Sequence, residues 1–101
     1  MRYEMKAETE SQKCYGINFR KLKEAMKSNR LTAADMEMLF ALLCYLQKDN
    51  LVSIHQQDIA DELGIQRSSV TRSITHLVKA GLFVREGRAL YASRDCFIYC
   101  N

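Results

Sequence analysis

The stretch from Ile54 to Ala92, IHQQDIADELGIQRSSVTRSITHLVKAGLFVREGRALYA, decides the fold of this chain. On either side of Gly64, apolar residues recur at helical spacing, which predicts helices over residues 56–63 and 67–79. Gly64 is expected to end the first helix, because glycine adopts the left-handed conformation of a helix C-cap without steric cost. Two short apolar runs separated by a glycine-containing turn then predict a β-hairpin.

The two helices and the hairpin share one predicted core. Its members in the helices and their connection are Ile59, Ala60, Leu63, Ile65, Val70, Ile74, Leu77 and Val78, with Ile65 in the corner between the helices. Residues 82–85 and 89–92 are the predicted strands of the hairpin, and residues 86–88 its turn. This arrangement is a helix-turn-helix with a wing, so the predicted fold class is mainly α with a small β wing, a winged helix-turn-helix.

The rest of the chain extends this unit into one domain, residues 15–101. Residues 1–14 are polar and lack periodicity, so we expect a flexible tail. Two further helices are predicted, one capped by Asn18 and one by Thr32 with Asp35 three residues later. Their predicted buried residues are Phe19, Leu22, Ala25 and Met26, and then Met36, Leu39, Phe40, Leu42, Leu43, Cys44 and Leu46. Short strands are predicted where Tyr15, Ile17 and Phe19 alternate and over residues 51–54. Residues 97–99 are predicted to form a last strand or an extended docking segment.

The composition excludes several classes of protein. No apolar run approaches the ~18 residues that cross a bilayer, and the N-terminus has no apolar leader, so we expect a cytoplasmic protein without a membrane partner. The four cysteines include no CxxC pair, and the two histidines no HxxxH pair with each other, so we expect no metal and no cofactor. We also expect no enzyme, because the chain lacks a phosphate-binding loop and a nucleophile motif.

Charge is divided along the chain. The net charge is only +3, but residues 31–65 hold one Lys and six Asp or Glu, whereas residues 66–94 hold six Lys or Arg and one Glu. The change falls at the start of the second helix of the pair. A basic block of this kind is the electrostatic pattern expected where phosphates are neutralised. We therefore expect double-stranded DNA as the partner.

The polar face of the second helix carries residue types that read bases in the major groove. Arg bonds guanine, Gln bonds adenine, and Ser and Thr hydroxyls bond bases or phosphates. Arg67 and Arg72 are the predicted main contacts, and Thr75, His76 and Lys79 are expected nearer the phosphate backbone. The predicted DNA-binding residues are Gln66, Arg67, Ser68, Ser69, Thr71, Arg72, Thr75 and Lys79, together with Arg85 and Arg88 of the wing.

Simpler interpretations of these features stay open. The basic helix that follows Asn18 fits a solvated surface as well as a phosphate contact, and a basic wing also fits an ordinary polar hairpin. The whole winged helix fits a protein-interaction module that never binds DNA. His55 is expected to be a cap or surface residue.

The segment DIADELGIQRSSVTRSITHLVKAGLFVR, residues 58–85, resembles the helix-turn-helix and first wing strand of bacterial winged-helix regulators, including the MarR and cAMP-receptor-protein groups. From Ile17 to Tyr99 the order of elements is also similar to RepL-type plasmid replication initiators. The resemblance implies a bacterial, sequence-specific DNA-binding protein in plasmid or phage replication, or alternatively a transcriptional repressor. DNA-reading roles would carry over to Gln66, Arg67, Ser69, Thr71 and Arg72, with Val70 in the core.

We also expect a homodimer, because winged helices often bind palindromic sites as dimers. The predicted dimer surfaces are residues 1–30 and the last strand, where Phe97, Ile98 and Tyr99 supply apolar area. The replication or transcription machinery is a further expected partner.

Overall fold

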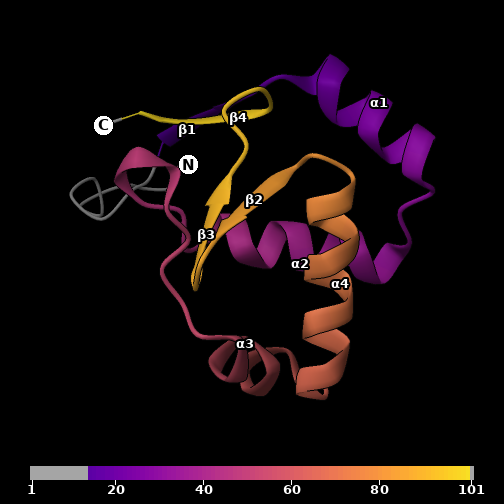
Figure 1. Cartoon of the computed structure of the whole chain (residues 1–101), viewed down its shortest axis with the longest axis vertical. Helices are drawn as coiled ribbons and strands as arrows, with labels where there is room; N and C mark the ends of the chain where they lie inside the picture. The colour runs from indigo at the N-terminus through magenta and orange to yellow at the C-terminus, as the bar shows by residue number, and fades with distance from the viewer. Residues whose placement is uncertain (1–13, 101) are drawn as a thin grey trace, which may run out of the picture.

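The computed structural model describes residues 14–100. Within this part of the chain the predicted helix pair and wing are confirmed, so the fold is a mainly α winged helix-turn-helix (Figure 1). The elements in chain order are β1 (Cys14–Ile17), α1 (Phe19–Asn29), α2 (Ala33–Leu43), the 3₁₀ turn η2 (Lys48–Asn50), α3 (Gln56–Leu63), α4 (Arg67–Lys79), β2 (Phe83–Glu86), β3 (Ala89–Ala92) and β4 (Phe97–Cys100). The expected tail, residues 1–14, lies outside the described residues except for Cys14, which begins β1.

Local sequence explains where the helices begin. The side chain of Asn18 accepts a hydrogen bond of 3.1 Å from a backbone N–H in the first turn of α1. At α2, Thr32 Oγ1 accepts from the Asp35 N–H and Asp35 Oδ2 accepts from the Thr32 N–H, both at 3.1 Å, which completes a capping box. The N-cap residues of α3 and α4 are His55 and Gln66, although neither side chain bonds the helix.

α4 packs on both α3 and α2, and the α3–α4 turn depends on Gly64. Gly64 has φ 68°, the left-handed conformation predicted for it. Ala60, 1% exposed, is the small residue buried in α3, the helix that packs on α4. The expectation that Ile65 fills the corner is wrong: its side chain is 39% exposed and is not part of the core.

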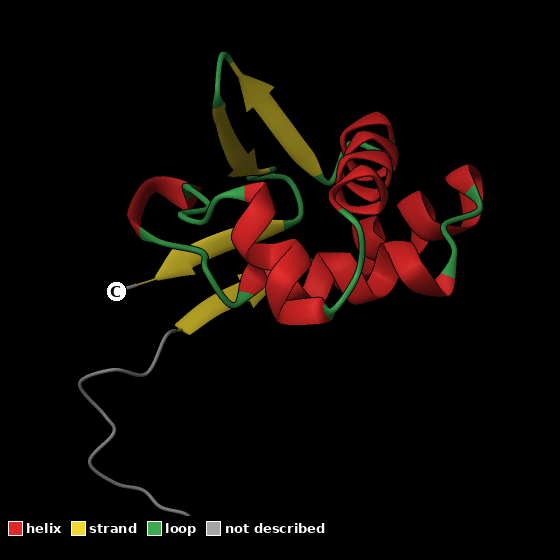
Figure 2. Ribbon diagram, turned by 90° about the horizontal axis from the view of Figure 1, so that it is seen from below, coloured by secondary structure: helices red, strands yellow, loops and turns green. Residues whose placement is uncertain are grey.

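The wing is an antiparallel pair of β2 and β3 that stands out from the helices (Figure 2). Glu86 pairs with Ala89, so the turn contains only Gly87 and Arg88 and is one residue shorter than predicted. Gly87 has φ 61°, which suits the tight hairpin turn.

A second antiparallel sheet joins β1 to β4, with Tyr15 opposite Tyr99 and Ile17 opposite Phe97. Both strands were predicted, but Phe19, also assigned to the first of them, begins α1 because Asn18 caps that helix. The pairing of the two strands was not predicted. The strand predicted over residues 51–54 is reduced to isolated bridges, because η2 turns the chain immediately before it.

The side chain of Asn50, buried at 1% exposure, connects the two sheets. Its Nδ2 donates to the Phe97 carbonyl at 2.7 Å and to the Ala92 carbonyl at 3.0 Å. Its Oδ1 accepts from the Tyr99 N–H at 2.9 Å. One amide group therefore ties β4 to the end of β3.

The core differs from the predicted one mainly in α1 and α2. Phe19 and Phe40 are 69% and 56% exposed, and Met26 and Cys44 are exposed too, so these predictions of burial are wrong. The buried face of α2 consists of Asp35, Met38, Leu39, Leu42 and Leu43, which places Phe40 on the opposite side.

Phe97 is also part of the core, because it is fully buried and lies beside Phe83 with ring centroids 6.2 Å apart. It cannot contribute to a dimer surface as predicted, whereas Ile98 is 54% exposed. None of the described helices is long and apolar enough to cross a membrane.

Candidate nucleic-acid interface

The outer face of α4 is polar along its whole length. The opposite face buries Val70, Ser73, Ile74 and Leu77. The predicted contacts that lie exposed on or beside α4 are Gln66, Arg67, Ser68, Thr71, Arg72, Thr75 and Lys79, and Ser69 is half-buried. Helical spacing places Arg67 and Thr71 on one stripe, and Ser68, Arg72, Thr75 and Lys79 on the next.

A cleft of about 520 Å³ lies between α4, the start of α3 and the wing. Arg67 of α4, Arg85 of β2 and Arg88 of the wing turn all line it. His55 and Gln56, at the start of α3, complete its polar lining. The fold thus brings together three separately predicted arginines. It also adds His55 and Gln56, which were not predicted to belong to the site, and whose only signal in the sequence is their position at a helix start.

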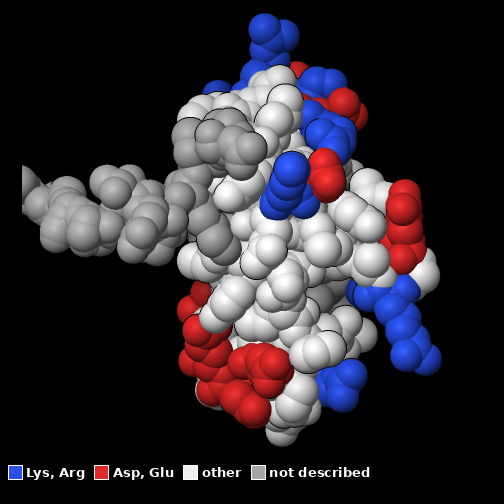
Figure 3. Space-filling view, turned by 90° about the vertical axis from the view of Figure 1, so that its left-hand side faces the viewer, with Lys and Arg blue, Asp and Glu red and all other residues white. Residues whose placement is uncertain are grey.

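Basic side chains line this cleft, and acidic side chains are concentrated on the outer side of α3. Among the described residues, no ion pair involves Arg67, Arg72, Lys79, Arg85 or Arg88. Acidic side chains instead gather over α3, where Asp58, Asp61 and Glu62 are exposed. Figure 3 shows a cluster of acidic side chains at the lower end of the molecule, with basic side chains to its right. A polyanion is therefore attracted to the α4 and wing side and repelled from the outer side of α3.

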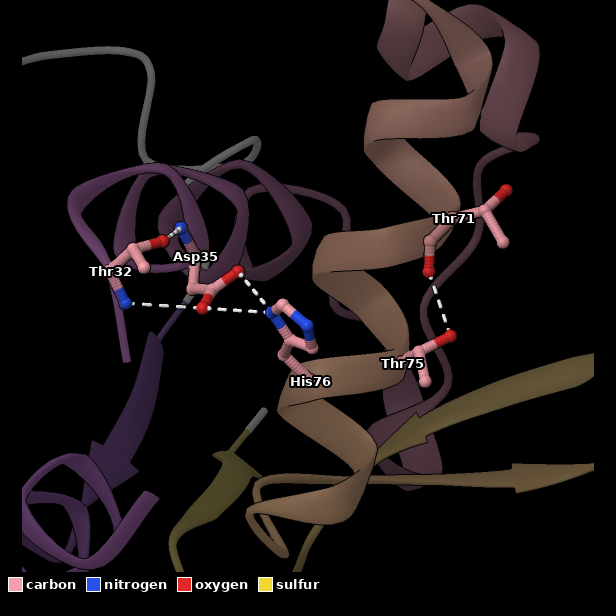
Figure 4. Close-up of polar contacts among 5 residues, drawn as sticks. All are labelled: Thr32, Asp35, Thr71, Thr75 and His76. Carbon is pink, nitrogen blue, oxygen red and sulfur yellow. Dashed lines mark hydrogen bonds and ion pairs between the residues drawn. The ribbon is translucent and has the colours of Figure 1, made fainter. Parts of the chain in front are cut away.

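Internal hydrogen bonds hold the two threonines of the interface. Thr71 Oγ1 donates to Gln56 Oε1 at 2.9 Å. Thr75 Oγ1 donates to the Thr71 carbonyl at 2.9 Å (Figure 4). A hydroxyl has one proton, so neither threonine has a proton left for a phosphate oxygen. Each offers lone pairs and a methyl group, which suit a base amino group or a thymine methyl. The threonine hydroxyls were expected to bond either bases or phosphates, and these internal hydrogen bonds favour contacts with bases.

His76 contacts the carboxylate of Asp35, which was not predicted. Its side chain is 44% exposed, but Nδ1 lies 3.2 Å from both carboxylate oxygens of Asp35 (Figure 4). Burial raises the pKa of Asp35, but hydrogen bonds from Thr32, His76 and Ser73 outweigh burial, and the pKa is lower than its ordinary value. His76 therefore anchors α4 to the start of α2.

No group of three or more His, Cys, Asp or Glu side chains within residues 14–100 is placed to hold a metal ion. Cys96 is buried, and burial together with nearby Asp95 raises the pKa of its thiol. A raised pKa disfavours the reactive thiolate.

Residues 28–95 match the family model of the Crp-like helix-turn-helix domain. The chain belongs to the Crp-like helix-turn-helix family. The match covers α2, α3, α4 and the wing, which are the elements that build the cleft. Helix-turn-helix domains of this kind bind DNA, so this Crp-like domain is a DNA-binding domain. Searches of curated proteins and of solved structures found no match.

Proposed function

We propose that this Crp-like domain binds double-stranded DNA sequence-specifically, and acts by binding rather than by catalysis. In this proposal α4 enters the major groove, and the wing lies on the adjoining backbone. The observation that carries the proposal is the position of Arg67, Arg85 and Arg88 on one cleft, directly beside the serine and threonine face of α4.

The geometry supports different roles for different side chains. Arg67 is the first residue of α4, where backbone N–H groups without helical partners also favour an anion, so it is assigned to a phosphate with Arg85 and Arg88. Arg72 lies one turn along on the outer stripe and is assigned to a base edge, with Gln66, Ser68 and Ser69 nearby. Lys79, at the far end of α4, is assigned to the backbone.

Two substitutions separate these roles. Arg72→Ala is expected to weaken binding to the specific site by ~1–3 kcal/mol and to relax the preference at one base pair. Arg88→Ala is expected to weaken specific and non-specific binding alike, and to reduce the slope of log affinity against log salt by about 1. Fluorescence anisotropy with a labelled duplex measures both effects.

Arg20→Ala is the matched control, because Arg20 is also exposed but lies on α1, which contributes no residue to the lining of the cleft. Its affinity should equal that of the wild type. An Arg72→Ala variant with unchanged affinity and specificity would mean that α4 is oriented differently on the DNA.

For the biological process, we propose control of plasmid or phage replication. The order of elements from Ile17 to Tyr99, which resembles RepL-type initiators, supports it. Transcriptional regulation is the second candidate, and the match to a Crp-like domain favours it. In either process the corresponding machinery is the expected protein partner.

Selection of bound sites from random duplex DNA separates these candidates. An array of repeats supports replication control, and a single inverted repeat supports an operator. No detectable binding even at low salt would contradict both and leave a protein-interaction module, because phosphate contacts strengthen as salt falls.

A further inference from the structure

The β1–β4 sheet has one covered edge and one open edge. The Asn18 N–H donates to the Cys96 carbonyl at 2.8 Å, and the register continues with Gly16 opposite Ile98. Hydrogen-bonded pairs alternate along an antiparallel ladder, so the even-numbered residues of β1 bond to β4. The N–H and C=O groups of Tyr15 and Ile17 must then point away from β4, toward the opposite edge.

The outer edge of β4 is covered by Asn50. Its side-chain amide bonds the Phe97 carbonyl and the Tyr99 N–H, which are the outward-facing groups of β4. Among residues 14–100, no side chain bonds the outer edge of β1 in this way. Within the described part of the chain, no hydrogen bond uses the outward backbone groups of Tyr15 or Ile17.

We propose that this open edge of β1 binds β1 of a second copy of the chain. The two strands run antiparallel about a two-fold axis at Gly16, so Tyr15 lies opposite Ile17 of the partner subunit. The outward N–H and C=O groups of each copy then meet those of the other. The sheet becomes continuous in the order β4–β1–β1–β4.

Three features favour a second copy as the occupant. The pattern of outward groups is self-complementary, as a two-fold interface requires. The sequence of β1, CYGI, has no charge, proline or bulge of the kind that protects edge strands from pairing. Gly16 lies on the axis, where the strands of a non-hydrogen-bonded pair approach to about 4.5 Å between Cα atoms, and it has no side chain to hinder them.

Exposed apolar side chains lie on the neighbouring strand and just after β1. Ile98, 54% exposed, lies opposite Gly16 on β4, and Phe19, 69% exposed, follows β1 by two residues. If the proposed DNA binding also holds, a two-fold dimer presents two α4 helices to an inverted repeat.

Gly16→Lys tests the pairing. A Cβ at Gly16 meets no heavy atom within 4 Å, and its φ is outside the left-handed region, so the monomer accepts a side chain there. In the dimer, two ammonium groups would face each other at the axis, which destabilises a cross-strand pair. Sedimentation equilibrium without DNA should show a wild-type dimer and a dimerisation constant weakened by about fivefold in the variant.

Ser28→Lys is the matched control, because it adds the same charge at an exposed position of α1 and should dimerise like the wild type. Circular dichroism checks the fold of each variant. If Gly16→Lys does not fold, Tyr15→Pro replaces it, since proline removes an outward N–H from an edge strand and leaves the β1–β4 ladder intact. Dimerisation should weaken similarly.

Amide hydrogen exchange tests the strand pairing independently of the oligomeric state. The Tyr15 and Ile17 amides should be protected in the dimer and exchange quickly in Gly16→Lys. A wild type that stays monomeric at all concentrations overturns the proposal, and protection of these amides in that monomer would show that the same chain covers its own edge. A dimer unaffected by Gly16→Lys overturns it too. Because DNA is absent, failure of DNA binding would leave this result unchanged.

Discussion

Removal of the Asp35 carboxylate should weaken the contact between α2 and α4. Asp35 is buried, accepts the Thr32 N–H of the capping box, and is bonded by His76 and Ser73 of α4. Loss of a helix cap costs about 1 kcal/mol, and an unpaired buried hydroxyl such as that of Ser73 costs about 1–3 kcal/mol. Asp35→Ala should therefore lower the free energy of unfolding by about 2–4 kcal/mol, which corresponds to a Tm lower by roughly 10–25 °C.

The contribution of the Asp35 carboxylate to stability should depend on pH. The pKa of Asp35 is lowered in the folded protein, so its ionised form stabilises the fold. This contribution is complete above the pKa of Asp35 in the unfolded chain and is lost as the pH falls through the folded value. Asp35→Asn should be less stable than the wild type at neutral pH, and the difference between the two should shrink in acid.

Urea unfolding at neutral pH and along an acid series measures both effects. Glu37→Ala is the control, because Glu37 is an exposed acid on the same helix. A free energy of unfolding for Asp35→Ala within ~0.5 kcal/mol of the wild type would refute the reasoning, since changes of that size are typical of uninvolved surface positions. A difference between Asp35→Asn and the wild type that does not depend on pH would refute the assigned role of the charge.

Two further substitutions test the fold. Asn50→Ala leaves buried backbone groups of β4 without partners and should cost at least about 1–3 kcal/mol in urea unfolding; a variant as stable as the wild type would mean that water replaces the amide. Gly64→Ala should lower the stability by about 1–2 kcal/mol, because φ is 68° and the new methyl group meets no neighbour. Gly16→Ala, the same chemical change without a positive φ, should leave stability nearly unchanged, and an equal loss in both variants would contradict the backbone argument.

Helix ends could be predicted from the sequence, because they depend on residues close together in the chain. Asn18, Thr32 and Gly64 are residues whose side chain or backbone freedom marks a helix end, and each lies where it was expected. The face of α2 was harder to predict because that helix is apolar on several sides. Periodicity alone could not show that Met38 is buried and Phe40 exposed.

The candidate site was predicted as a set of residues but not as a shape. The cleft depends on how the wing packs beside α4, and helical spacing contains no information about the distance between the wing and α4. The same holds for His76, whose acidic partner Asp35 lies 41 positions away in the chain. The hydrogen bond from the Thr71 hydroxyl to Gln56 could not be predicted either, because it depends on how α3 packs beside α4.

The Asn50 amide also limits how the molecule can deform. Both of its Nδ2 hydrogen bonds and its Oδ1 are engaged, one with the end of the wing and two with β4. Since a planar amide cannot rotate to follow one partner without leaving the other, the wing base and the terminal sheet have almost no independent degree of freedom. A force on the wing would thus reach β4 through this amide as well as through the contact between Phe83 and Phe97, and bending between these parts would strain its hydrogen bonds.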